Sequence, residues 1–167
     1  MIEIALYQPD IPPNAATILR MGACFGLTVR IIEPAGFIWT DSAFRRAGLD
    51  YLDRARVIRH PSWEGFREQT CGQRIILMTT RATLPYTEFT FIPRDIILMG
   101  RETSGAPREV HASGDARLVI PIVPGNRSLN VAIACAIVTS EALRQLHRFV
   151  HLSQAQDRDR PHRAPST

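Results

Sequence analysis

The chain has 167 residues, of which 45% are hydrophobic and 22% charged, and its formal net charge is +4. This composition is typical of one globular domain that buries its own core, and no apolar run is long enough to cross a bilayer. All 20 basic residues are arginine, which favours a phosphate-bearing partner, although a genome rich in G and C is an alternative explanation for the missing lysine.

The N-terminus and the cysteines indicate where in the cell the protein is expected and whether it binds a metal. No basic stretch precedes an apolar one at the N-terminus, so we expect no signal peptide and a cytoplasmic location. Cys24, Cys71 and Cys135 are widely spaced and form no C-x-x-C pair, so we expect small buried residues and neither disulfides nor zinc. His147 and His151 lack a third ligand nearby, so we expect no metal.

Strand and helix patterns alternate along the chain. Apolar runs predict strands at residues 2–7, 28–32, 57–58, 74–79, 95–99 and 117–122. Helices are predicted after residues 12–13 with Asn14 as cap and Gly26 as terminator, at 62–69 with Ser62 as cap, after Pro107, and from near Ser128; residues 42–47 suggest one further turn. This order predicts an α/β domain with an open parallel sheet flanked by helices.

Two strands late in the chain end abruptly in glycine and small polar residues. The first runs into Gly100 and Gly105, and the second continues to Ser128, a good helix cap, with Asn130 just inside the helix. Because open α/β sheets bind ligands at their carboxyl edge, these two loops predict a ligand pocket.

The turn after the first strand excludes an ordinary dinucleotide-binding domain. Residues 8–13 contain no glycine and include prolines without amide donors, although Glu33 suits the end of a second strand. No P-loop is present either.

The last helix is apolar around its whole circumference. Such a helix must be covered on most sides, and one sheet covers only one face, so we predict a symmetric homodimer. Burial within the monomer alone is the alternative. Residues 149–167 are polar and lack periodicity, so we expect a domain at 1–148 followed by a disordered tail; an RNA-contacting tail is the alternative.

Three short motifs then resemble those of a known family. Residues 11–14 with Arg20, residues 100–107 and residues 120–130 are similar, in this order, to the motifs of the SPOUT class of RNA methyltransferases, which use S-adenosylmethionine. Residues 32–37 and 45–51 resemble the subgroup that methylates the ribose 2'-hydroxyl of the wobble nucleotide, position 34, in tRNA. The resemblance extends from residue 1 to about residue 148.

The resemblance implies a fold, a cofactor and a set of roles. It implies a parallel α/β domain whose C-terminal segment is threaded as a trefoil knot. It also implies Arg20, Asn130 and Glu102 as catalytic residues, with Arg20 stabilising the nascent alkoxide. The cofactor-binding residues that it implies are Met78, Gly100, Ile120, Ser128 and Leu129.

The implied substrate is cytidine or modified uridine in the anticodon stem-loop. A cluster of arginines is a candidate phosphate-contacting surface, although an ordinary solvated face explains it as well: Arg45, Arg46, Arg54, Arg56 and Arg59. Two other functions stay open, a methyltransferase of this class acting on ribosomal RNA and a non-catalytic tRNA-binding module. The chain departs from the class at Ala16, Arg101, Ser104 and Ala106.

Overall fold

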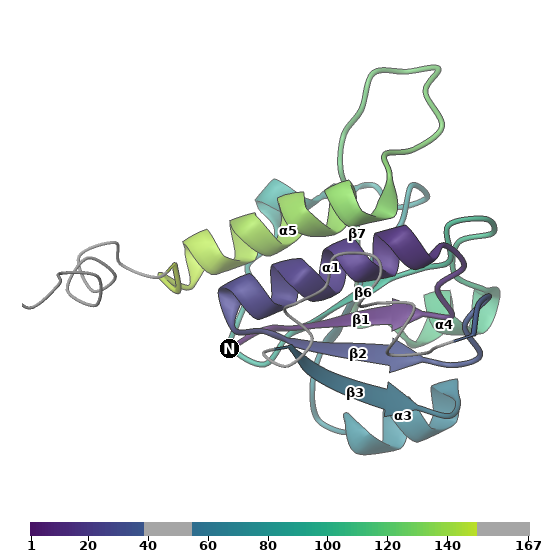
Figure 1. The fold of residues 1–167 in the computed structure, drawn as a ribbon. Coiled ribbons are helices and arrows are strands. Elements are labelled where there is room, and N and C mark those ends of the chain that lie inside the picture. Colours follow the sequence, from purple (N-terminus) through teal and green to yellow (C-terminus); the bar gives the residue numbers. More distant parts are fainter. Residues whose placement is uncertain (39–54, 150–167) are drawn as a thin grey trace, which may run out of the picture.

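The computed structural model describes residues 1–38 and 55–149. Within these residues the predicted parallel α/β architecture is confirmed: seven strands form one parallel sheet in the order β3-β2-β1-β6-β4-β7-β5 (Figure 1). The strands are β1 (Glu3–Tyr7), β2 (Thr28–Ile32), β3 (Arg56–His60), β4 (Ile75–Met78), β5 (Leu84–Pro85), β6 (Ile96–Met99) and β7 (Ala116–Val119). The helices are α1 (Pro12–Phe25), α3 (Trp63–Gln69), η2 (Tyr86–Glu88), α4 (Arg108–Ser113) and α5 (Val131–Gln145).

Helices cover both faces of the sheet. Because side chains alternate along a strand, Ile4 and Leu6 face the core under α1 and α5, which lie side by side in Figure 1. Ala5 faces the other core, with Phe66 of α3 and Val110 of α4. The two-sided burial explains why the central strands are apolar at every position.

Helix α1 begins earlier than the sequence predicts. Its N-cap is Ile11, without a side-chain cap, and Pro12 begins the helix, so the expectation that Asn14 caps it is wrong. Proline suits this place because the first amides of a helix have no partner within it. Gly26 ends the helix as predicted, in the left-handed conformation at φ 66°.

A largely buried polar row runs diagonally across three strands, from the amino end of β1 to the carboxyl end of β3. Arg30 of β2 donates to Glu3 of β1 and lies 3.2 Å from Nε2 of His60 on β3. His60 is fully buried against the ring of Phe66, and its Nδ1 has no hydrogen-bond partner among the described residues. Burial, with the nearby Arg30 charge, lowers the pKa of His60.

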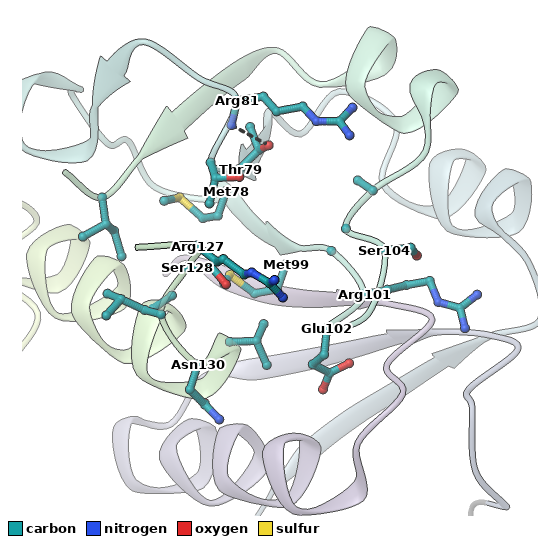
Figure 2. A pocket seen from close by; sticks show the side chains of 18 of the residues that line it. Met78, Thr79, Arg81, Met99, Arg101, Glu102, Ser104, Arg127, Ser128 and Asn130 are labelled. Atoms are coloured by element: carbon teal, nitrogen blue, oxygen red, sulfur yellow. Dashed lines mark hydrogen bonds between the residues drawn. The ribbon is translucent and has the colours of Figure 1, made fainter. Parts of the chain in front are cut away.

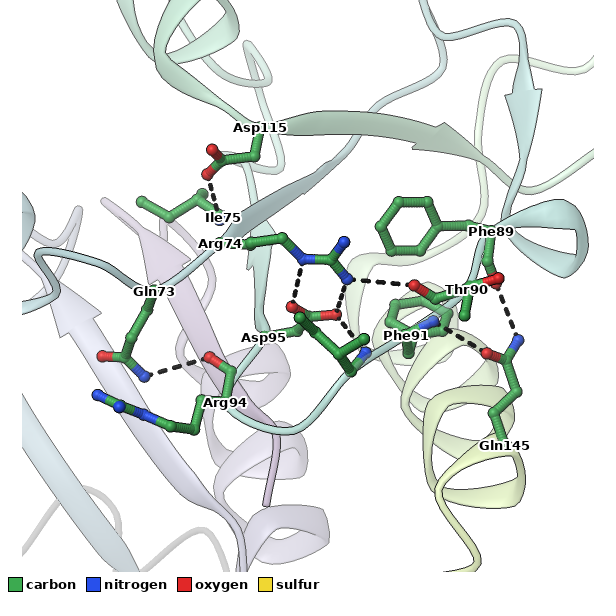
Figure 3. A network of polar contacts seen from close by, with 11 residues as sticks. Gln73, Arg74, Ile75, Phe89, Thr90, Phe91, Arg94, Asp95, Asp115 and Gln145 are labelled. Carbon is green, nitrogen blue, oxygen red and sulfur yellow. Dashed lines mark hydrogen bonds and ion pairs between the residues drawn. The ribbon is translucent and has the colours of Figure 1, made fainter.

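A second polar network joins the amino ends of β4 and β6 to the end of α5 (Figure 3). The buried carboxylate of Asp95 accepts from Nε and Nη2 of Arg74 at 2.8 and 2.7 Å. Gln145 accepts from the amide of Phe91 at 2.9 Å and donates to the carbonyl of Phe89 at 3.0 Å. These bonds fix the far end of α5, opposite the end that forms the site.

Two further predictions are wrong, one about the burial of the cysteines and one about the end of β7. Cys24 and Cys71 are exposed, and of the three cysteines only Cys135 is buried. β7 ends at Val119, so residues 120–122 lie outside the strand, and Ile120 and Ile122 line the pocket instead. The turn predicted at residues 42–47 and most of the predicted tail lie outside the described residues.

The circumference of α5 is unevenly covered. Its buried residues follow one helical stripe: Ala132, Cys135, Val138, Thr139, Ala142 and Leu143. Ile133 on another side is 55% exposed. The expected homodimer stays a prediction, as does the trefoil knot.

Candidate active site

Three adjacent strands send their following loops to one place. β6, β4 and β7 are neighbours in register, with Met78 of β4 opposite Met99 of β6 and Leu118 of β7. The loops that follow these strands therefore meet at the carboxyl edge, as the sequence predicts. Between them lies a pocket of about 480 Å³ (Figure 2).

The pocket has apolar walls with polar groups at their edges. Its main apolar lining residues are Met78, Met99, Val119, Ile120, Ile122 and Leu129. Its polar lining includes Asn14, Thr79, Arg81, Arg101, Glu102, His111, Arg127, Ser128 and Asn130. Such a mixture is typical of a small-molecule site that fixes the orientation of its ligand.

The loop after β6 is closed tightly on itself. Arg101 and Gly105 exchange two backbone hydrogen bonds, of 3.2 and 2.9 Å, and Gly105 has a φ of 71°. A Cβ on Gly100 would lie 2.7 Å from the amide nitrogen of Ala106 and 2.9 Å from the carbonyl carbon of Gly105. Position 100 therefore requires glycine.

Asp10 holds this loop against the turn after β1. Its carboxylate accepts from Nη2 of Arg101 at 2.5 Å and from the hydroxyl of Thr103 at 2.6 Å. The hydrogen bond from Arg101 is the main reason that the pKa of Asp10 lies below its ordinary value. A Cβ on Gly36 would come within 3.0 Å of Asp10, so the loop after β2 packs closely there as well.

Glu102 begins a chain of hydrogen bonds that crosses the site. Its carboxylate accepts from the amide of Asp10 at 2.7 Å and from Nδ2 of Asn14 at 3.3 Å. Oδ1 of Asn14 in turn accepts from Nδ2 of Asn130 at 2.9 Å. Side chains from all three motif regions are thus linked directly.

Asn130, and not Ser128, caps α5. Its Oδ1 accepts from the amides of Ala132 and Ile133 at 2.8 and 3.4 Å, so the prediction that Asn130 lies inside the helix is wrong. The helix begins later because residues 120–130 form a long loop after β7 before it starts. Ser128 remains in the pocket wall.

The structure brings together all of the predicted site residues except Arg20. Those that line the pocket are Met78, Gly100, Glu102, Ile120, Ser128, Leu129 and Asn130. Arg20 lies on the exposed side of α1, outside this lining. It follows Asn14 by six residues, about 9 Å along the helix axis.

Sequence reasoning missed Asp10, Arg81 and His111. His111 lines the pocket from α4, and burial, followed by the charges of Arg81 and Arg117, lowers its pKa. No local pattern marks these three residues, because their role depends on neighbours distant in sequence.

The arginine cluster predicted to contact phosphate is only partly described. Arg45, Arg46 and Arg54 lie outside the described residues. Arg56 is exposed on β3, whereas Arg59 is paired with Glu33, so its charge is partly compensated.

Residues 1–140 match the SpoU rRNA Methylase family. The chain belongs to this family. A relative from Beijerinckia indica subsp. indica, named tRNA (cytidine(34)-2'-O)-methyltransferase, is 57% identical over 154 residues, which are 91% of this chain and 96% of that protein.

Solved structures agree with this membership. One, described as giving structural insights into the 2-OH methylation of C/U34 on tRNA, has a TM-score of 0.84 and 36% identity, covering 88% of this chain and 97% of that one. An AdoMet-bound rRNA methyltransferase from Sinorhizobium meliloti has a TM-score of 0.76 and 25% identity, covering 87% of this chain and 56% of that one.

In residues 1–38 and 55–149, no group of three or more histidine, cysteine, aspartate or glutamate side chains is placed to hold a metal ion. Within the same ranges, no helix has the length and apolar character needed to span a membrane.

Proposed function

We propose that this chain transfers a methyl group from S-adenosylmethionine to the ribose 2'-hydroxyl of nucleotide 34, cytidine or modified uridine, in the anticodon loop of tRNA. The observation that carries the proposal is the convergence on one pocket of Met78 at the end of β4, Glu102 in the loop after β6 and Asn130 at the start of α5. The relatives named for this reaction align over nearly the whole chain and support it.

The pocket fits S-adenosylmethionine in size and in chemistry. Its volume of about 480 Å³ lies within the range of roughly 300–1,000 Å³ typical of small-molecule sites. Met78, Ile120 and Leu129 offer apolar walls for an adenine ring. The Glu102 carboxylate offers negative charge to a cationic sulfonium.

When bound, S-adenosylmethionine supplies an electrophilic methyl group, which is transferred to the 2'-oxygen of the ribose. The other products are S-adenosylhomocysteine and the proton of the hydroxyl group. The protein must align the reacting groups, and orientation alone contributes several kcal/mol to lowering the barrier. The chain of hydrogen bonds from Glu102 through Asn14 to Asn130 fixes two walls of the pocket relative to each other. We assign alignment to these residues.

Arg20 is assigned the stabilisation of negative charge on the 2'-oxygen. A guanidinium keeps its proton at neutral pH, so it acts by charge and hydrogen bonding, while a water or an RNA phosphate accepts the hydroxyl proton. Since Arg20 lies outside the pocket lining, this role requires the target ribose to lie between the pocket and the exposed side of α1.

We propose a homodimer formed through the less covered side of α5, where Ile133 is exposed, and a cytoplasmic enzyme that needs no metal. We expect Ile133→Glu to weaken the dimer, because it would bury a charge without a partner in the interface. Measuring the size of the wild-type protein and of this variant in solution tests the proposal.

The test of function uses a strain that lacks the gene. Mass spectrometry of tRNA nucleosides is expected to show a 2'-O-methylated wobble nucleotide after restoring wild type, but none after restoring Arg20→Ala at the same protein level. Restoration by both genes would contradict the role of Arg20. Restoration by neither would contradict the proposed function.

A further inference from the structure

Three cationic or titratable side chains, from the loop after β4, from α4 and from β7, lie near one another at one side of the pocket, where the charges of two arginines act on a histidine. We call Arg81, His111 and Arg117 the basic rim. Arg81 and His111 line the pocket, and Figure 2 shows Arg81 on the opposite side of it from Asn130. None of these residues belongs to the three motif regions.

The fold holds the rim in place. The amide of Thr79 donates to the carbonyl of Leu118 at 2.9 Å, which ties the loop after β4 to β7. The amide of Arg81 then donates to the hydroxyl of Thr79 at 3.2 Å. Leu118 is buried in the core beneath α5, so Arg117, the preceding residue of the strand, faces the side of α4.

The two arginines of the rim are not held in ion pairs within the part of the chain that is described. Within it, neither Arg81 nor Arg117 forms an ion pair with a carboxylate, and both are exposed. The carboxylate of Asp115 is engaged by the amide of Ile75 at 2.7 Å.

The electrostatics of His111 agree with this geometry. Burial lowers the pKa of His111, and the two arginines lower it further, because a third positive charge is unfavourable beside them. The rim is therefore a region of positive potential at the pocket edge, where an anion is stabilised.

We propose that the basic rim binds a backbone phosphate of the substrate RNA beside the nucleotide held at the pocket, an inference that rests on the proposed function. Arginine presents a planar fork of donors that matches phosphate oxygens, and neutral His111 has one ring N–H to donate. RNA carries a phosphate on each side of every internal nucleotide. A phosphate at the rim fixes the register of the strand without reading its bases.

The test compares salt dependence among matched variants of the full chain. Arg81→Gln and Arg117→Gln each remove one rim charge, and Arg94→Gln removes a charge that is also exposed but lies at the amino edge of the sheet, where Figure 3 shows it. Affinity for a fluorescent anticodon stem-loop RNA is measured over a series of salt concentrations. Affinity for S-adenosylmethionine is measured by calorimetry on the same proteins.

The rim variants are expected to bind the RNA several-fold more weakly at low salt. Their plots of log affinity against log salt are expected to be shallower by about 0.7–0.9 per lost phosphate contact. Arg94→Gln is expected to keep the wild-type slope, and all variants to keep the wild-type affinity for S-adenosylmethionine.

Three outcomes would overturn the inference. Rim variants that methylate and bind RNA with the wild-type slope would refute the rim alone and leave the proposed function standing. A loss of cofactor affinity with an unchanged slope would assign the rim to the carboxylate of the cofactor. Wild-type protein that neither binds nor methylates the RNA would refute the proposed function, and the rim proposal with it.

Discussion

Nδ2 of Asn130 donates a hydrogen bond of 2.9 Å to Oδ1 of Asn14, which joins the first turn of α5 to the first turn of α1 across 116 residues of chain. Asn14 extends the link to Glu102 at 3.3 Å, while Asn130 also caps α5. One amide side chain thus serves both as a structural cap and as part of the pocket wall.

These two roles of Asn130 can be separated by substitution. Asn130→Ala is expected to lower the free energy of unfolding by about 1 kcal/mol, the usual cost of losing a helix cap. Asn130→Asp keeps an acceptor for the helix amides but removes the donor to Asn14, so we expect near-normal stability and weaker cofactor binding. Urea denaturation and calorimetry measure the two effects.

Asn126→Ala is the control for this pair, because Asn126 lies in the same loop and its side chain donates to the nearby carbonyl of Val123. An alanine variant at 130 as stable as wild type would contradict the capping role. Normal cofactor binding by Asn130→Asp would contradict the role of the link to Asn14.

Gly100→Ala tests the tight loop after β6. The new methyl group would meet the backbone at 2.7 Å, so the loop must open, at a cost of about 1–3 kcal/mol. We expect affinity for S-adenosylmethionine to fall about tenfold or more in calorimetry. Gly114→Ala is the matched control, since its nearest contacts, at 3.5 Å, are ordinary. Equal affinity in the two variants would refute the requirement for glycine at position 100.

The open sheet was predictable because the central strands are apolar runs of the right length that end in glycine, proline or polar residues. The pocket followed from the same rule, which places Gly100 and Ser128 at one edge. The cap of α5 did not follow, since Ser128 and Asn130 are both good caps and only the length of the preceding loop decides between them.

Other features depend on tertiary contacts that no local pattern contains. Asp10 looks like an ordinary turn residue, yet it holds Arg101 and Thr103 from a loop more than ninety residues away. Cys24 and Cys135 both lie on helices, and only packing decides that one is exposed and the other buried. The position of Arg20 outside the pocket likewise depends on the rotation of α1 about its axis.

His60 makes stability depend on pH. Burial, followed by the charge of Arg30, lowers the pKa of His60 in the folded protein below its ordinary value of 6.5. Just below pH 6.5, His60 therefore binds a proton in the unfolded chain but not in the folded chain. We expect the contribution of neutral His60 to the free energy of unfolding to be complete above this pH. It should be lost progressively as the pH drops toward the pKa of His60 in the folded protein.

His60→Gln is expected to reduce this loss between pH 7 and pH 5 while keeping an acceptor for Arg30. Urea midpoints of wild type and variant over this range measure it. Parallel curves for the two proteins would show that His60 does not titrate on unfolding.

The three cysteines are expected to differ in reactivity. Burial raises the pKa of the Cys135 thiol to about 12, so it stays protonated and shielded at neutral pH, whereas Cys24 and Cys71 are exposed. A thiol reagent is expected to modify Cys24 and Cys71 in the folded protein and Cys135 only after denaturation. Rapid labelling of a folded Cys24→Ser, Cys71→Ser double variant would contradict the burial of Cys135.

The most direct test is methyl transfer by the purified protein to a synthetic anticodon stem-loop, with labelled S-adenosylmethionine and nucleotide 34 carrying either ribose or 2'-deoxyribose. We expect label on the 2'-oxygen of nucleotide 34 in the ribose substrate and none in the deoxyribose substrate. Equal labelling of both RNAs, or label at another nucleotide, would contradict the proposed function.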